Sequence, residues 1–259
     1  MAENTATARK DGNIKHMIAV MSGKGGVGKS VVTSLLAIAL QRQGLRVGIL
    51  DGDLLGPSIV GMFGTEIELS MSDEGNILPL SSEHGVKIMS MSMFLENEAD
   101  PTAWQGTMVA SAFKQFYGEV EWDQLDYLLI DVPPGTSDVP MTILRSLPLD
   151  GVVIVSSPQG IATTVVKKCI NMVHQFNVPI VGVVENMAYY MAPGGEYCEI
   201  FGPSNEAALV ALAGAPLLGQ LPLDPRLATL CDAGRIEEYR VEAYKTVAAN
   251  FLDALQVSR

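Results

Sequence analysis

The stretch that decides the fold is Gly23-Lys24-Gly25-Gly26-Val27-Gly28-Lys29-Ser30, which fits the phosphate-binding pattern G-x-x-x-x-G-K-[ST]. In this pattern the glycines let successive backbone N–H groups turn toward an anion, the lysine reaches the β- and γ-phosphates, and the hydroxyl ligates Mg²⁺. The apolar residues 18–21 predict a buried strand before the loop, and residues 31–43 predict a helix that ends at Gly44. This strand–loop–helix order favours a phosphate site over the alternative, a glycine-rich turn that binds nothing.

Lys24 is a second lysine in this loop, and the loop pattern assigns it no contact. A side chain at the start of the loop does not easily reach the phosphates of its own site. A cation without a local task suggests one that acts on a second copy of the chain. We therefore expect Lys24 to reach across the interface of a homodimer.

The composition indicates one large α/β domain rather than two small ones. The chain has 259 residues, of which 48% are hydrophobic, and this is ample for a sizeable core. We expect residues 1–15 to form a flexible tail and residues 16–259 to form a single domain.

Charge and hydropathy exclude several classes of function. The formal net charge of −12 provides no basic field for nucleic acid or anionic lipid. No apolar run approaches the roughly 18 residues that a membrane span needs, and the polar first residues are unlike a signal peptide. The three cysteines, Cys169, Cys198 and Cys231, lie far apart, which argues against a disulfide framework and a Cys-x-x-Cys metal site. We expect a cytoplasmic protein with no nucleic-acid partner and no stable membrane anchor.

Apolar strand patterns alternate with helical patterns along the chain, which predicts a doubly wound, mostly parallel sheet with ligands at the C-terminal ends of its strands. We expect strands at residues 46–50, 86–91, 127–130, 152–155, 180–184 and 216–221, and helices at residues 104–117, 161–176, 206–213 and 236–257. Residues 65–85 predict a small excursion with short strands. The last helix carries balanced charge, so we expect it to pack on the domain or on a partner rather than on a membrane.

Three aspartates follow predicted strands near the loop, where a nucleoside triphosphatase needs oxygen ligands for Mg²⁺ and a group that positions water. We expect Ser30 to ligate Mg²⁺ directly, Asp131 to support the ion from just behind its ligands, and Asp53 to lie near the ion and orient the attacking water. Asp51 is the weakest candidate of the three. For each aspartate alone, the alternative is a helix cap or a solvated turn.

Several segments carry a resemblance to a known family. Residues 21–30 resemble the deviant Walker A loop of the MinD/ParA class of dimerising ATPases, whose signature lysine crosses to the partner's nucleotide. Within that class, the following segments resemble the Mrp/ApbC subfamily of iron–sulfur cluster carriers: 50–58, 126–136, 183–187, 200–202 and 221–225. The likeness extends from about residue 18 to at least residue 235, and its motifs are highly specific together although none is so alone.

The resemblance implies a homodimer that encloses two ATP molecules, with Lys24, Lys29 and Asp53 in the catalytic machinery. It implies that Asp131 lies near the metal and that Asn186 contacts the adenine base. An amide offers a purine edge both a donor and an acceptor, and the alternative for Asn186 is an Asx-type turn. The implied nucleotide-binding residues are Gly23, Lys24, Gly25, Gly26, Val27, Gly28, Lys29, Ser30, Val31 and Asn186.

The sequence departs from this family where a bridging [4Fe–4S] cluster is commonly held by Cys-Pro-x-Cys. Pro193 is retained, but Ala192 and Gly195 occupy the two cysteine positions, and neither side chain can ligate iron. Cys198 follows three residues later, and two copies in a dimer supply only two thiolates. Glu196, Glu199 or a client protein could complete such a site, and the alternative is a lone thiol without metal.

Smaller departures leave nucleotide binding intact but affect its coupling to cargo. Val31 replaces a second hydroxyl, which removes a hydrogen bond of about 1 kcal/mol to the α-phosphate. Gln105 and Val165 replace an arginine and an aspartate that are common in the family.

Three hypotheses follow. The first is a homodimeric Mg²⁺-dependent ATPase of Mrp/ApbC type that serves iron–sulfur or other protein clients. The second is a regulatory or positioning ATPase of MinD/ParA type without metal cargo, and the third is a binding module with vestigial hydrolysis.

Overall fold

The computed structural model describes residues 13–53, 58–66, 68–90, 93, 113 and 119–257. Apart from Phe113, the predicted helix at 104–117 lies outside the described residues, as do Gln105 and most of the expected tail.

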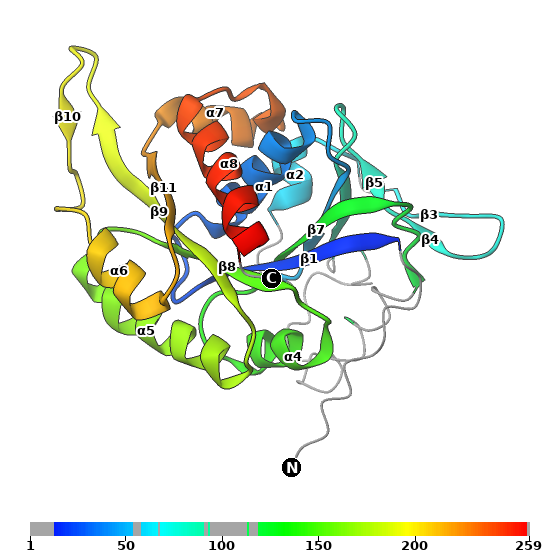
Figure 1. Cartoon of the computed structure of the whole chain (residues 1–259). Helices are drawn as coiled ribbons and strands as arrows, with labels where there is room; N and C mark the ends of the chain where they lie inside the picture. Colours follow the sequence, from blue (N-terminus) through cyan, green and yellow to red (C-terminus); the bar gives the residue numbers. More distant parts are fainter. Residues whose placement is uncertain are drawn as a thin grey trace.

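A nine-stranded sheet forms the centre of the molecule, in the order β10-β9-β8-β1-β7-β2-β6-β5, with β11 paired to β9 (Figure 1). Its strands are β1 (Ile14–Ser22), β2 (Val47–Asp51), β5 (Leu80–Ser81), β6 (Lys87–Ser90), β7 (Leu125–Asp131), β8 (Gly151–Ser156), β9 (Ile180–Met191), β10 (Tyr197–Cys198) and β11 (Leu217–Pro222). The pairs β5–β6 and β9–β10 are antiparallel, and the remaining pairs are parallel. The predicted mostly parallel α/β sheet is therefore confirmed.

Helices cover both faces of this sheet (Figure 1). They are α1 (Lys29–Gln41), α2 (Ile59–Phe63), α4 (Asp138–Ser146), α5 (Gly160–Gln175), α6 (Glu206–Ala213), α7 (Pro225–Asp232) and α8 (Glu242–Val257). Residues 65–85 hold the expected excursion, including the hairpin of β3 (Ser70–Met71) and β4 (Ile77–Leu78). Within the described segments, no helix is long and apolar enough to cross a membrane.

The core divides into two layers because successive side chains of a strand point to opposite faces. Along β1, Ile18 and Val20 pack in the layer under α1 and α8, whereas Met17, Ala19 and Met21 pack in the layer that includes α4, α5 and α6. A central strand that is buried on both faces consists of a nearly continuous apolar run. The apolar runs at residues 127–130 and 152–155 predicted strands, and they lie in β7 and β8.

Two elements differ from the prediction in their bounds. Strand β9 does not stop at residue 184, because it continues in parallel register with β11 to Tyr189 and then pairs with β10. The expected helix at 236–257 is broken into a 3₁₀ turn, Ile236–Glu238, and α8. At this break the Arg42 guanidinium donates hydrogen bonds to the backbone carbonyls of Glu237 and Tyr239. These bonds join the break to the end of α1.

The short helices α4 and α7 were not predicted. The start of helix α7 carries a sequence signal, since the Asp224 side chain accepts a hydrogen bond from the Arg226 N–H as an N-cap and Pro225 occupies the first turn.

Candidate functional site

The glycine-rich loop connects β1 to α1 over residues 23–28, and its backbone requires glycine at two positions. Gly26 and Gly28 have φ angles of 78° and 77°, in the left-handed region that disfavours other residues. A Cβ atom at Gly23 would lie 2.6 Å from the Val166 backbone nitrogen, so the start of the loop packs tightly against α5. Apart from its chain neighbours, no described residue has an atom within 4 Å of a Cβ built at Gly26, so the middle of the loop is open on the side of the described residues. This geometry suits a loop whose backbone receives an anion.

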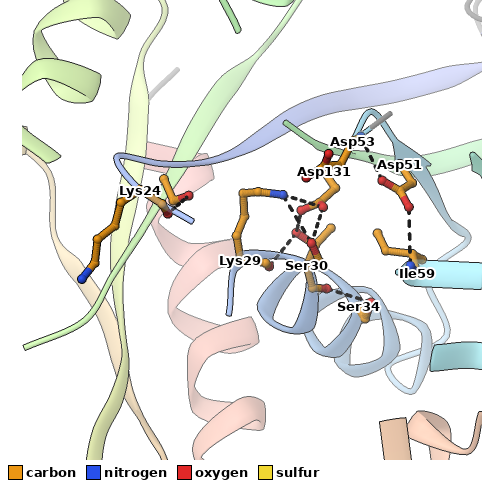
Figure 2. Close-up of polar contacts among 10 residues, drawn as sticks. Lys24, Lys29, Ser30, Ser34, Asp51, Asp53, Ile59 and Asp131 are labelled. Carbon is orange, nitrogen blue, oxygen red and sulfur yellow. Dashed lines mark hydrogen bonds and ion pairs between the residues drawn. The ribbon is translucent and has the colours of Figure 1, made fainter. Parts of the chain in front are cut away.

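Lys29, Ser30 and Asp131 meet at the carboxyl end of β7, as the sequence predicted (Figure 2). The Lys29 ammonium lies 2.5 Å from Asp131 Oδ2, and the Ser30 hydroxyl donates to the same oxygen at 2.6 Å. Lys29 is 6% exposed and Asp131 is fully buried. Thr33, one turn further along α1, donates to the second carboxylate oxygen at 2.7 Å. Three donors therefore fix this buried carboxylate beside the loop.

Asp51 lies directly across from Asp131, since the two residues are paired in the register of β2 and β7. Its oxygens accept hydrogen bonds from the backbone N–H groups of Asp53 at 3.1 Å and Ile59 at 3.4 Å. Burial, and then the charge of Asp131, raise the pKa of Asp51 to about 7. Asp51, the weakest of the three aspartate candidates from sequence, thus accepts backbone hydrogen bonds at both ends of the segment that runs from Asp53 to the start of α2.

Asn186 lies against the loop rather than at the end of a strand. Its side-chain amide donates to the Val27 carbonyl at 2.8 Å, and a Cβ at Gly28 would lie only 2.3 Å from its nitrogen. The parallel pairing of β9 with β8 ends at Glu185, and Met187 has a left-handed φ of 56°. The pairing with β8 therefore ends next to the predicted end of the strand, but β9 continues beyond it into a hairpin.

Glu185 is a buried polar residue of this region that the sequence reading did not single out. The carboxylate is fully buried and accepts hydrogen bonds from Ser204 Oγ at 2.5 Å, Asn205 N at 2.8 Å and Gln220 Nε2 at 2.9 Å. It ties β9 to β11 and to the start of α6. A glutamate directly after four apolar strand residues was the signal that could have found it.

Lys24 does not join the Lys29 cluster. Figure 2 shows its side chain pointing away from Lys29, Ser30 and Asp131. Its ammonium donates instead to the side-chain carbonyl of Gln159, the residue before α5.

The positions of the missing cysteines lie in the tight turn between β9 and β10. The Gly195 N–H donates to the Ala192 carbonyl at 2.8 Å, and Cys198 is half-buried opposite Tyr190 on the paired strands. Within the described segments, no group of three or more His, Cys, Asp or Glu residues could hold a metal ion. The turn brings no second thiol to Cys198.

Of the other two cysteines, one lies in the core and one packs against it. Cys169 is fully buried, and burial raises the pKa of its thiol to about 12. Cys231 is half-buried and packs against the layer under α1.

Comparison with known proteins identifies the family. The model of a ParA family, described as NUBPL iron-transfer P-loop NTPase, matches residues 13–256. The chain belongs to this family of P-loop NTPases. It is 42% identical over 238 residues to a protein of Clostridium perfringens named iron-sulfur cluster carrier protein, covering 89% of this chain and 84% of that protein.

Solved structures agree with this assignment. A nucleotide-binding protein from Archaeoglobus fulgidus, solved in complex with ADP, superimposes with a TM-score of 0.79 at 42% identity, over 90% of this chain and 91% of that one. The septum site-determining protein MinD from Pyrococcus horikoshii, with Mg-ADP, gives a TM-score of 0.68 at 22% identity, over 94% and 98% of the two chains, and this likeness concerns the fold. The resemblance to the MinD/ParA class and its Mrp/ApbC subfamily is confirmed.

Proposed function

We propose that this NTPase is a homodimeric, Mg²⁺-dependent ATPase whose nucleotide state switches the interface between its two protomers. The observation that carries the proposal is the convergence of Lys29, Ser30 and Asp131 beside an open glycine-rich loop. The ADP complex of the Archaeoglobus fulgidus relative supports an adenine nucleotide as the ligand.

The residues around the loop fit a nucleotide with Mg²⁺. The loop backbone and Lys29 would hold the β- and γ-phosphates, which replace Asp131 as the partner of the ammonium. Ser30 would ligate Mg²⁺, with Asp131 and Asp53 supplying further oxygen atoms at or just behind the ion, and such oxygen donors suit this hard cation. Bound Mg²⁺ would neutralise charge that develops on the phosphates.

Three further residues complete the proposed site. Asp53, placed by its backbone bond to Asp51, would orient the attacking water. Asn186 would present its amide to the adenine base from beside Gly28. Lys24 would leave Gln159 and reach the phosphates bound by the partner protomer, so that ATP closes the dimer and hydrolysis relaxes it.

The cargo of this switch is proposed to be an iron–sulfur client protein, as supported by the name of the Clostridium perfringens relative. The donor set of this chain does not fit a bridging cluster by itself, because Ala192 and Gly195 leave Cys198 as one thiolate per protomer. A direct cluster would need ligands from Glu196, Glu199 or the client. We place this activity in the cytoplasm, where the three unpaired thiols are stable.

A second candidate is a regulatory or positioning ATPase of MinD/ParA type without metal cargo. The specific observation in its favour is the same turn, which keeps Pro193 but has no thiol beside it. Both candidates share the ATP site and differ in what the dimer carries.

Light scattering of the purified chain tests the shared part of the proposal. We expect a mass shift from monomer to dimer with Mg²⁺ and ATP, a return to monomer as ATP is consumed, and no shift with ADP or with EDTA. A mass that does not respond to Mg²⁺ and ATP would refute the switch. Anaerobic reconstitution with iron and sulfide then separates the two candidates.

A further inference from the structure

The second half of β9, the following turn and β10 form a hairpin that stands off the body of the molecule (Figure 1). We call residues 187–202 the β9–β10 arm. The ATP site described above uses Asn186 at its base but no residue of the arm itself.

The arm exposes an apolar surface. Six large apolar side chains of the described residues are exposed, and three of them lie on the arm: Met191 at 49%, Tyr197 at 54% and Ile200 at 54%. Met191 and Tyr197 lie directly opposite each other on the paired strands, so their side chains share one face. Exposed apolar side chains that gather on one projecting element are typical of a protein-binding surface.

The arm is held in a fixed shape before any partner binds. The rings of Tyr189 and Tyr197 stack with centroids 4.8 Å apart and an interplanar angle of 22°. The Ala192 N–H donates to the Glu196 carbonyl at 2.9 Å, and the Leu223 N–H donates to the Tyr189 carbonyl at 2.7 Å, which joins the arm to the end of β11. A surface that is already ordered loses less conformational entropy when it binds.

A groove of about 510 Å³ lies at the base of the same arm. It is lined by Tyr189, Tyr190, Met191 and Pro193 on the arm side and by residues 222–226 on the other. Arg226 at its edge is neutralised by Asp224, 2.6 Å away. An apolar side chain of a partner could therefore enter the groove beside the exposed face, and the charge of Arg226 would stay paired with Asp224.

The charged residues of the arm itself have one sign. No lysine or arginine occurs between Lys168 and Arg226, whereas Glu196 and Glu199 flank Tyr197. Such a rim repels anionic partners. A complementary surface has an apolar centre and a cationic edge.

We propose that the β9–β10 arm docks a protein partner that presents an apolar patch bordered by lysine and arginine side chains. The partner contacts Met191, Tyr197 and Ile200 with its apolar residues and Glu196 and Glu199 with its cationic ones. The inference names the kind of client that the proposed switch serves. It does not depend on ATP turnover, so the two can fail separately.

A defined probe tests the arm: a synthetic amphipathic helix of leucine and lysine, measured by fluorescence anisotropy against the full chain. We expect the triple variant Met191→Ser, Tyr197→Ser, Ile200→Ser to weaken binding about tenfold or more, because these side chains form the apolar centre. The matched control, Leu69→Ser, Met71→Ser and Val257→Ser, removes three exposed apolar side chains elsewhere and should leave affinity within about twofold.

Charge and location are tested in parallel. Glu196→Gln with Glu199→Gln should weaken binding several-fold more than Glu74→Gln with Glu83→Gln, which removes the same charge from exposed positions elsewhere. Hydrogen exchange should show that the probe protects residues 189–200. Equal losses in the arm and control variants, or equal binding of a leucine–glutamate helix, would overturn the proposal. So would loss of ATP-dependent dimerisation in the arm triple variant with probe binding intact, because the arm would then contact a second copy.

Discussion

The Lys24 ammonium donates a hydrogen bond to the side-chain carbonyl of Gln159, and this contact holds it on the opposite side of the loop from Lys29. Ser22 Oγ donates to the Lys24 carbonyl at 3.0 Å, which also fixes the backbone at this point. In the isolated protomer, therefore, the two lysines of the loop occupy separate environments. Reaching a partner protomer requires the Lys24 side chain to break its bond to Gln159.

The first prediction concerns this pair. Lys24→Ala should spare ATP binding by the monomer and abolish ATP-dependent dimerisation, because the proposed contact in the partner is lost. Gln159→Ala should shift dimerisation to a several-fold lower protein concentration, since breaking one partly buried hydrogen bond costs roughly 1 kcal/mol. Sedimentation equilibrium with Mg²⁺ and a non-hydrolysable ATP analogue measures both effects. Lys245→Ala, at an exposed position of α8, is the control, and identical behaviour of Lys24→Ala and Lys29→Ala would contradict the assignment.

The second prediction concerns the buried pair of Lys29 and Asp131. Lys29→Ala should abolish ATP binding, and it should also destabilise the fold by roughly 3 kcal/mol because Asp131 loses its cation. Asp131→Asn separates the two effects, since it keeps the shape of the side chain while removing the charge. We expect this variant to remain folded by circular dichroism and to need more than about tenfold higher Mg²⁺ for turnover. An unchanged Mg²⁺ requirement would show that Asp131 does not support the ion.

The third prediction concerns Asp53. If this carboxylate orients the attacking water, Asp53→Ala should slow ATP turnover by about 10²-fold or more while ATP affinity changes little. Single-turnover kinetics measure the rate of ATP turnover, and equilibrium binding of a fluorescent ATP analogue measures the affinity. Asp73→Ala, which removes an exposed aspartate from the excursion, is the matched control. Wild-type turnover in Asp53→Ala would assign water positioning to another group.

The fourth prediction follows from the buried carboxyl of Asp51. Its pKa is raised to about 7 in the folded chain, against about 3.9 in an unfolded one. The folded state therefore binds the proton more tightly, so this group's contribution is fully present below about pH 4 and is lost as the pH rises toward 7. Asp51→Asn removes this dependence.

Urea unfolding in EDTA measures the effect. The variant keeps one acceptor oxygen of the two, so either the Asp53 or the Ile59 N–H loses its partner, and it should be less stable than the wild type at pH 5. The deficit should shrink between pH 5 and pH 8, by at most about 1.4 kcal/mol per pH unit. A deficit that is constant with pH would show that Asp51 titrates normally.

The sequence predicted those parts of the fold and site that depend on local pattern. Glycines at fixed spacing specify the loop, and an apolar run that ends in Asp131 specifies a central strand with a carboxylate at its end. Long-range contacts are not encoded in such patterns. The bonds from Arg42 that accompany the break before α8 join residues almost 200 positions apart, and the role of Asp51 depends on its register with β7.

The arm shows the same limit. The sequence predicted a strand at residues 180–184 only, and only the pairing with β10 reveals that β9 continues to Met191 as part of a hairpin. The sequence showed that Ala192 and Gly195 replace two cysteines. It did not show that these positions close a turn in which a second thiol would come near the first.

The fifth prediction uses that turn. Ala192 and Gly195 are joined by a hydrogen bond of 2.8 Å, so Ala192→Cys with Gly195→Cys should create a pair of neighbouring thiols on each protomer. Two protomers would then supply the four thiolates that a [4Fe–4S] cluster requires. Gly195 has a φ of 83°, so the new cysteine costs roughly 1–2 kcal/mol of backbone strain, although its Cβ meets no atom of the described part of the chain within 4 Å beyond its chain neighbours.

Anaerobic reconstitution with iron and sulfide, followed by iron analysis and visible absorption, compares this double variant with the wild type and with Cys198→Ser. We expect the double variant to retain iron and the other two chains to retain equally little, because one thiolate per protomer leaves the cluster half ligated. Iron that is retained by the wild type and lost in Cys198→Ser would show instead that Cys198 ligates a cluster completed by other groups. In that case the nucleotide switch would act on a cluster held by the protein itself.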